Sequence, residues 1–447
     1  MAPPSAAQRE ISPESGRAKR HVLLVASAFP PSAGPGARRA LRFARGLAGH
    51  GMRVSVLTLE DRFHYLGIDP LSRSDAEGSF EVLRTGTWDP IARMKARRGL
   101  SQHGVVHPGG ATTPSGDRPI APLPVRMASE VLRSVLLPDT EVAWVPPASR
   151  RALAVHARDP IDVVIATLPP RSALVGAAYI AGRTGARLVV DYRDPWAADR
   201  AHSPPRPRWL QAIDARIERR CLRRAALALF TSPSALAFYR REFPWLPRLE
   251  VLYNGIDSWT PRADGSPPPP LTWTYAGELY DGRNLTVVVR AMAALRERVD
   301  ARLVVVGSEP TAERALGREL GVEDRIEYVG RLPFRSTLER LRRSHRLVAM
   351  IPAAHSLSIP AKVFDYLGTR RPLLLLCDPD HAAAAVLAGI PQHRVLHPDD
   401  VAGVEVLLSE DAASLCGGGM PDVDAEALER FDAGAQMRQL AGWIREL

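Results

Sequence analysis

Short apolar runs alternate with amphipathic stretches along most of the chain, and this alternation constrains the fold more than any other feature. The first run, HVLLVASAF from His21, precedes a glycine- and proline-rich turn, a helical pattern over Ala37–Gly49, and a second run, MRVSVLTL. The order strand, turn, helix, strand is typical of a βαβ unit. These runs lack polar alternation, as expected of strands buried on both faces of a parallel sheet. The sequence therefore predicts an α/β fold.

The alternation occurs twice, on either side of the stiff segment Ser266–Pro270 (SPPPP). Further strands are predicted at Asp162–Ala166, Arg187–Asp191, Leu227–Thr231 and Glu250–Tyr253, and then at Leu271–Ala276, Arg302–Gly307, Arg325–Val329, Leu347–Ile351 and Leu373–Cys377. Two doubly wound Rossmann-like domains facing a cleft follow from this pattern. Ligands of such folds bind at the carboxyl ends of the strands, so the cleft is the predicted binding site.

Composition divides the chain further. We expect a disordered tail over 1–20, a first domain over 21–257 with a long mobile loop at 90–125, and a proline-rich linker over 258–271. The second domain is predicted over 272–423. A final helix over 424–447 could pack on either domain.

Charge is distributed unevenly between the halves. The chain carries 59 basic and 49 acidic residues, a net charge of +10, and residues 1–250 hold 37 of the basic and 22 of the acidic ones. The first half should therefore face an anionic partner. A nucleic-acid partner is not expected, because no basic stretch is interleaved with aromatic residues.

The three cysteines lie far apart, without the spacing of a zinc site or a disulfide framework, which fits a reducing cytoplasm. No apolar run approaches the roughly 18 residues of a membrane span. The sequence therefore predicts a cytoplasmic protein.

Six segments, taken in order, resemble the bacterial family-four glycosyltransferases, retaining enzymes of the GT-B fold. The resemblance runs from about His21 to the C-terminus and skips the 90–125 loop. It implies transfer of a sugar from a nucleotide-diphosphate donor to a hydroxyl acceptor, with retention. No metal or other cofactor is expected, because the sequence offers cations and a glycine-rich helix start for the diphosphate and no convincing cluster of metal ligands. The products would be polysaccharides, glycolipids or glycosylated metabolites. The segments are Phe29–Arg39 (FPPSAGPGARR), Leu137–Trp144 (LPDTEVAW), Ile165–Pro170 (IATLPP), Asp191–Trp196 (DYRDPW), Val251–Asp257 (VLYNGID) and Ser358–Leu367 (SIPAKVFDYL).

The glycine-rich turn is a candidate for contact with the donor. It connects a strand to the start of a helix, where free backbone N–H groups favour an anion. Gly34 and Gly36 would let the backbone approach a ligand, and Arg39 lies one turn into the helix. The alternative is that glycine serves only the turn itself.

In the second domain the resemblance assigns Arg283 and Lys362 to the donor phosphates and Asp365 to the ribose hydroxyls. Lys362 and Asp365 are three residues apart in a predicted helix and so share one side of it. An ordinary Lys–Asp helix pair and a solvated loop arginine are the alternatives.

The chain departs from the family pattern at two positions. Glu278 stands where many relatives carry arginine, and Leu357 stands where relatives have an acid eight residues before Asp365. The nearby Ser358 could supply a hydroxyl in place of that acid.

The segment DYRDPW carries the predicted catalytic residues. Arg193 takes the place of a histidine that many relatives have, and arginine cannot act as a base because it stays protonated. Asp194 can accept a proton. Asp191 and Asn254 are expected on the acceptor side, and a structural Asp–Arg pair is the alternative for this segment.

Two other functions remain open. One is a GT-B-fold sugar-nucleotide epimerase, which would lack an acceptor site. The other is a nucleotide-sugar-binding protein that has lost catalytic activity. A basic amphipathic stretch predicts weak, salt-sensitive association with a membrane that presents a lipid-linked acceptor. Its apolar residues, which lie among arginines, are Trp209, Leu210, Ile213 and Ile217. Its alternative is a helix docking its apolar stripe on the sheet.

Overall fold

The structure is a computed structural model that describes residues 19–32, 34–63, 78–89, 92–93, 136–196, 207–257, 259, 267–279, 282–353, 357–420 and 422–447. The predicted disordered tail lies outside these residues except for its last two. The predicted loop over 90–125 lies outside them except for residues 92–93.

The first domain is built on a seven-stranded parallel sheet in the order β3-β2-β1-β4-β5-β6-β7. The first six positions follow the order of the doubly wound nucleotide-binding fold. The strands are β1 (His21–Val25), β2 (Arg53–Leu59), β3 (Glu81–Thr85), β4 (Val163–Leu168), β5 (Arg187–Tyr192), β6 (Ala225–Phe230) and β7 (Leu249–Val251).

The second domain repeats the architecture with a six-stranded parallel sheet in the order β10-β9-β8-β11-β12-β13. Its strands are β8 (Leu271–Gly277), β9 (Ala301–Gly307), β10 (Ile326–Gly330), β11 (Arg346–Met350), β12 (Leu373–Leu376) and β13 (Arg394–Leu396). The predicted fold of two doubly wound domains is confirmed. The sequence did not predict the edge strands β3 (EVLRT) and β13 (RVL), because both are short and mix polar with apolar residues.

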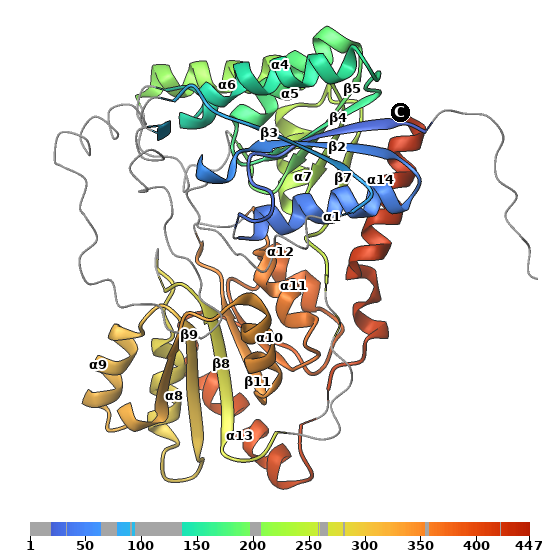
Figure 1. Ribbon diagram of the computed structural model, residues 1–447. Helices are drawn as coiled ribbons and strands as arrows, with labels where there is room; N and C mark the ends of the chain where they lie inside the picture. The colour runs from blue at the N-terminus through green and yellow to red at the C-terminus, as the bar shows by residue number, and fades with distance from the viewer. Residues whose placement is uncertain are drawn as a thin grey trace, which may run out of the picture.

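Helices cover both faces of the sheets (Figure 1). The first domain has α1 (Pro35–Gly49), α4 (Val145–His156), α5 (Ser172–Thr184), α6 (Arg208–Leu222) and α7 (Pro233–Glu242). The second has α8 (Thr286–Ala294), α9 (Thr311–Glu319), α10 (Phe334–Arg342), α11 (Ala361–Leu367), α12 (Ala382–Leu387) and α13 (Val401–Cys416), and α14 (Ala433–Glu446) ends the chain. Short 3-10 helices lie at Asp61–Phe63, Thr140–Trp144, Glu323–Arg325 and Glu426–Phe431.

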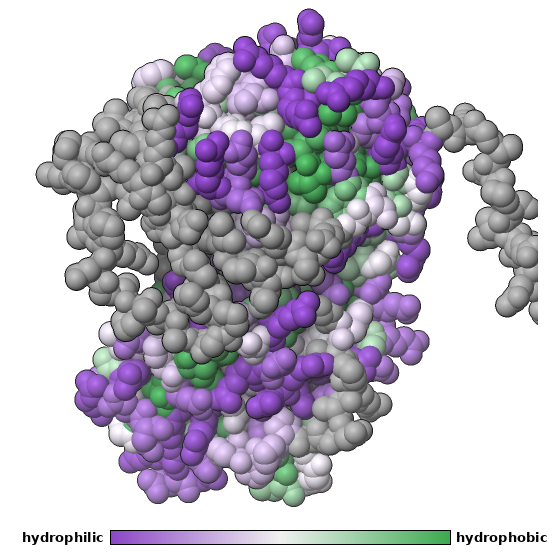
Figure 2. Space-filling model, in the orientation of Figure 1, coloured by the Kyte–Doolittle hydropathy of each residue, from purple (hydrophilic) through white to green (hydrophobic). Residues whose placement is uncertain are grey.

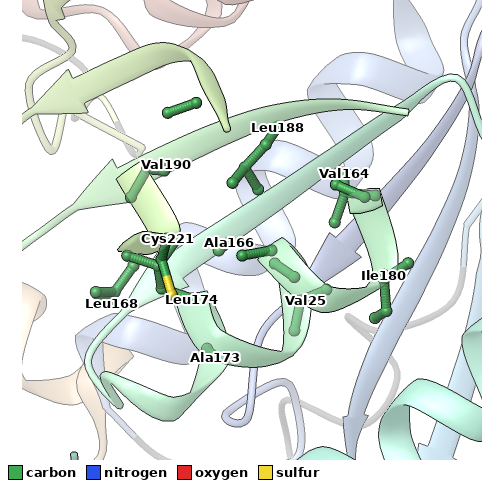
Figure 3. Close-up of a cluster of buried hydrophobic side chains, with 14 of the residues drawn as sticks. Val25, Val164, Ala166, Leu168, Ala173, Leu174, Ile180, Leu188, Val190 and Cys221 are labelled. Carbon is green, nitrogen blue, oxygen red and sulfur yellow. The ribbon is translucent and has the colours of Figure 1, made fainter. Parts of the chain in front are cut away.

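Apolar side chains fill the space between each sheet and its helices. Figure 3 shows part of the cluster between the first sheet and α5, where Val164, Ala166 and Leu168 of β4 lie among side chains of neighbouring elements. Cys221 is buried in this cluster, and burial raises the pKa of its thiol to about 11. In Figure 2 the larger hydrophobic patch lies on the upper, first domain, and hydrophilic residues predominate over the lower one.

The C-terminal helix crosses back to the first domain. The stretch predicted as one helix over 424–447 is interrupted at Asp432, and α14 then runs beside α1 (Figure 1). Met437, Leu440 and Ile444 join the apolar cluster beneath the first sheet. A Cβ at Gly46 would lie 2.4 Å from Cγ of Met437, so the glycine permits this close helix crossing. The crossing ties the two domains together at a second place besides the linker.

Candidate active site

A cavity of about 440 Å³ lies between the domains. It is at the carboxyl ends of β1 and β8, the strands at which the strand order of each sheet reverses. Such switch points are where doubly wound folds bind ligands. Its walls come from the first domain (Pro30, Ser32, Gly34, Ala37, Arg38, Leu41) and from the second (Ala276, Gly277, Glu278, Val306, Gly307, Arg331, Leu332, Pro333, Phe334, Arg335, Thr337, Leu338, Leu341, Lys362, Asp365, Tyr366).

Two glycines shape the floor of the cavity at the ends of β8 and β9. Gly277 and Gly307 have φ values of 144° and 125°, which side chains other than glycine rarely adopt. A Cβ at Gly307 would lie 2.2 Å from the carbonyl oxygen of Gly277. The ends of β8 and β9 can therefore lie this close together beside the cavity only with glycine at position 307.

Gly307→Ala should lower the free energy of unfolding by about 2–4 kcal/mol, because it combines a forbidden backbone angle with a clash against backbone. Thermal and urea unfolding would measure the change. Gly442→Ala is the matched control: it lies in α14 with open space around its Cβ, and alanine there should be neutral or stabilising by up to about 1 kcal/mol. A Gly307→Ala protein that unfolds at the wild-type midpoint would show that position 307 does not require glycine.

Lys362 lines the second-domain wall of the cavity. Its Nζ donates to the hydroxyl of Tyr275 at 3.2 Å and lies 4.4 Å from the centre of that ring. Burial, and to a lesser extent the charge of nearby Arg283, lower the pKa of Lys362 to about 7. The predicted helix register is confirmed, since Lys362 and Asp365 both face the cavity from α11.

Asp365 is held by an arginine of the other domain. Nη1 and Nη2 of Arg38 donate to its Oδ1 and Oδ2 at 2.9 and 3.0 Å. The same guanidinium lies 3.9 Å over the ring of Phe334. Arg38 was not among the predicted site residues, although it belongs to the glycine-rich segment and precedes Arg39 directly.

Arg39, predicted to contact the donor, does not line the cavity. Only 1% of it is exposed, and its guanidinium donates to Asp191 Oδ1 at 2.7 Å and Oδ2 at 3.0 Å, and to the carbonyl of Tyr253 at 2.9 Å. Asp191 is fully buried and also accepts from Thr167 at 2.8 Å. These bonds join α1 to the ends of β4, β5 and β7, so Arg39 and Asp191 are placed to stabilise the domain and not to meet a ligand or acceptor.

The segment after β7 meets the segment before α11 across the domain boundary. Asn254 donates through Nδ2 to the carbonyl of Ile359 at 3.2 Å, and Ser232 donates to that of Leu357 at 2.6 Å. The Leu357 side chain packs against the apolar cluster of the first domain. The residue in place of the family's acid therefore contributes to the interface between the domains. Ser358 is half-buried between these contacts.

The segment that follows β5 lies against the glycine-rich turn. Nε of Arg193 donates to the carbonyl of Leu168 at 2.9 Å, and Nη2 donates to that of Pro169 at 2.5 Å. A Cβ at Gly36 would lie 2.2 Å from Nη1 of Arg193, so Gly36 makes room for this arginine, whereas Gly34 lines the cavity. Asp194 follows, half-buried, at the carboxyl edge of the first sheet.

Buried hydrogen bonds fix the end of this segment. The backbone N–H of Trp196 donates to the hydroxyl of Tyr239 at 2.9 Å, and its indole donates to Asp214 of α6 at 2.9 Å. Tyr192 and Tyr239 both donate to Glu218, at 2.7 and 2.6 Å. Burial and the Glu218 carboxylate raise the pKa of both tyrosines, which keeps them protonated as donors. The backbone around Asp194 is therefore held rigidly from α6 and α7.

Glu278 is paired in the structure. Its Oε2 accepts from Nη2 of Arg331 at 3.0 Å and from the hydroxyl of Ser308. Arg331, which follows β10, thus places a guanidinium beside the end of β8 at the wall of the cavity. Arg283 is half-buried near Lys362 but does not line the cavity.

Among the described residues, no group of three or more histidine, cysteine or acidic side chains is placed to hold a metal ion. None of the described helices combines the length and the low polarity needed to cross a membrane.

Comparison with solved structures shows the class of fold. The chain is 14% identical to sucrose-phosphate synthase from Thermosynechococcus elongatus, with a TM-score of 0.59 over 96% of this chain and 99% of that one. Anabaena HepE, solved with UDP and glucose, is 13% identical to the chain, with a TM-score of 0.57 over 96% of this chain and 100% of that one. The lipopolysaccharide outer core galactosyltransferase WaaB is 12% identical to the chain, with a TM-score of 0.53 over 95% of this chain and 99% of that one. The architecture is therefore the two-domain GT-B fold.

Family comparison identifies the chain more closely. A sequence model described as a glycosyl transferase 4-like domain matches residues 34–255, and one described as glycosyl transferases group 1 matches residues 270–403. Together they span both domains, so this chain belongs to the family of glycosyltransferases that the two models describe, and the predicted resemblance is confirmed. A comparison with curated protein sequences gives no match.

Proposed function

We propose that the cavity binds a nucleotide-diphosphate sugar and that the enzyme transfers the sugar to a hydroxyl acceptor. The observation that carries this proposal is the placement of Lys362 and Asp365, a cation and a carboxylate on one helix, at the carboxyl end of β8. Lys362 would hold the phosphates and Asp365 the ribose hydroxyls. Arg283, beside Lys362 but outside the cavity wall, would add positive charge for the phosphates, and Gly34 would let the backbone of the first domain approach the donor. HepE was solved with UDP and glucose, which supports a donor of this kind.

The chemistry follows from these roles. The bond from the sugar's anomeric carbon to the diphosphate breaks, a bond from that carbon to the acceptor oxygen forms, and the acceptor's proton leaves. Lys362 and Arg283 would stabilise the charge on the departing diphosphate, so we propose that no metal or other cofactor is needed. Asp194 would accept the proton. We propose retention without a covalent intermediate, since no carboxylate is assigned here as a nucleophile.

A panel of nucleotide sugars, each offered with and without simple hydroxyl acceptors and with EDTA, tests this function by the release of nucleoside diphosphate. We expect one donor to be turned over, with or without chelator. Activity that vanishes with EDTA and returns with a divalent ion would overturn the metal-free mechanism. Binding without release would favour the nucleotide-sugar-binding protein without catalytic activity, and interconversion of the sugar without an acceptor would favour the epimerase.

We further propose that the acceptor is lipid-linked and is met at the cytoplasmic face of a membrane. Helix α6 buries Leu210 against the first domain, which matches the predicted alternative of a docked helix. However, Trp209 and Ile213 are 64% and 37% exposed, and Arg216 and Arg220 follow them at helical spacing on the same exposed stripe. A basic stripe with an exposed indole favours weak binding to anionic lipid.

Vesicles containing phosphatidylglycerol should therefore sediment the protein at low salt and release it as ionic strength rises. The double variant Trp209→Ser, Ile213→Ser should reduce the sedimented fraction several-fold. Trp245→Ser, which removes another exposed tryptophan, one outside α6, is the control and should behave as wild type. Equal sedimentation with neutral and anionic vesicles at low salt would refute the membrane contact.

A further inference from the structure

The ion pair between Arg38 and Asp365 joins the two domains across the cavity. Arg38 extends from the first turn of α1 and Asp365 from α11, and both oxygens of the carboxylate accept from the guanidinium. The pair is partly shielded from water, with the side chains 30% and 16% exposed. Bidentate pairs of this kind are stronger and more directional than single contacts.

The position that Arg38 occupies on Asp365 is the one a ribose would need. A bidentate guanidinium approaches a carboxylate end-on, with one donor for each oxygen. The two neighbouring hydroxyls of a ribose also present one donor to each oxygen. Both ligands therefore compete for the same edge of Asp365.

We propose that Arg38 is a gate on the ribose subsite: donor binding exchanges the Arg38–Asp365 ion pair for ribose–Asp365 hydrogen bonds. This inference rests on the proposed function. It makes Arg38 a determinant of donor affinity that acts from the opposite domain, and it couples occupancy of the ribose subsite to the contact between the domains.

The surroundings of Arg38 give the released guanidinium a place to stay. Its contact with the ring of Phe334 does not involve Asp365. The carboxylate of Asp257, which is paired with Arg42 one turn further along α1, is near enough to attract Arg38 as well. When the ion pair breaks, the Arg38 guanidinium is therefore not left buried among apolar groups without a partner.

The test compares two ligands in three proteins. The nucleoside diphosphate selected by the donor panel and its 2′,3′-dideoxy analogue are titrated into wild type, Arg38→Ala and Arg248→Ala by calorimetry. Only the ribose form must displace Arg38, so Arg38→Ala should raise the preference for ribose over dideoxyribose by about tenfold. Arg248→Ala removes a first-domain arginine that pairs with Glu250 and Glu446 and touches neither Asp365 nor Asp257, so it should leave this preference unchanged.

The dideoxy analogue controls for a loosened domain interface, because loosening alone changes the binding of both ligands alike. An unchanged preference for ribose in Arg38→Ala would overturn the gate. A reduced preference would also overturn it and would show that Arg38 helps Asp365 to bind the sugar. If no nucleoside diphosphate binds any of the three proteins, the proposed donor site itself fails and the gate with it. If both ligands bind and Arg38→Ala shows the same preference for ribose over dideoxyribose as wild type, the donor site is supported and only the gate is refuted.

Discussion

Asp194→Asn should lower kcat by about 10²–10⁴ while leaving the affinity for the donor nucleotide nearly unchanged. Asparagine keeps the shape of the side chain but cannot accept a proton. The backbone around position 194 is anchored through Trp196 to Tyr239 and Asp214, so the substitution should not displace the segment. Initial rates at saturating donor and acceptor, together with a calorimetric titration of nucleoside diphosphate, separate the two effects.

The competing source of catalysis is a phosphate oxygen of the donor acting as the base. In that case Asp194→Asn should be mild and Arg193→Ala severe, because Arg193 holds the carbonyls of Leu168 and Pro169 beside the glycine-rich turn. Asp380→Asn, an exposed carboxylate beyond β12, serves as the control and should retain wild-type rates. A loss of donor affinity in Asp194→Asn as large as its loss of turnover would show that Asp194 binds the donor instead.

The fold was predictable because its signal is local and repeated. Strands buried on both faces of a parallel sheet are continuous apolar runs, and each was visible in the sequence without knowledge of its neighbours. Strands β3 and β13 lie at sheet edges, and their segments EVLRT and RVL mix polar with apolar residues, so they form no apolar run. The other edge strands, β7 and β10, were predicted. The side on which α14 packs depends on Gly46 of a helix almost 400 residues earlier, which no local pattern reveals.

The site was predictable only where a single helix carries it. The spacing of Lys362 and Asp365 fixed their common side of α11. Arg38 and Arg39 are neighbours on α1 that point in different directions, and the predicted site residue, Arg39, is the buried one. Which of the two meets the cavity is decided by Asp191, which lies on another element and binds Arg39. The pairing of Glu278 with Arg331 is likewise a long-range contact.

Lys362→Met should weaken the binding of nucleoside diphosphate by about 1.5–3 kcal/mol, the usual range for losing a hydrogen bond to a charged group. The structure adds a dependence on pH. Burial, together with Arg283, lowers the pKa of Lys362 from 10.5 to about 7, and a bound diphosphate would raise it again by supplying the opposite charge. Above pH 7 the free enzyme holds this lysine mostly neutral, so binding there must take up a proton.

The affinity should therefore fall as the pH rises above 7 and should change little through this group at pH 6, where Lys362 is already protonated. Titrations at pH 8 in two buffers of different protonation enthalpy should show an uptake approaching one proton in wild type. Lys362→Met should show none from this site. Lys362→Arg keeps the charge without titrating, so it should retain more affinity than the methionine variant and also take up no proton. Equal proton uptake by wild type and Lys362→Met would remove Lys362 from the phosphate site.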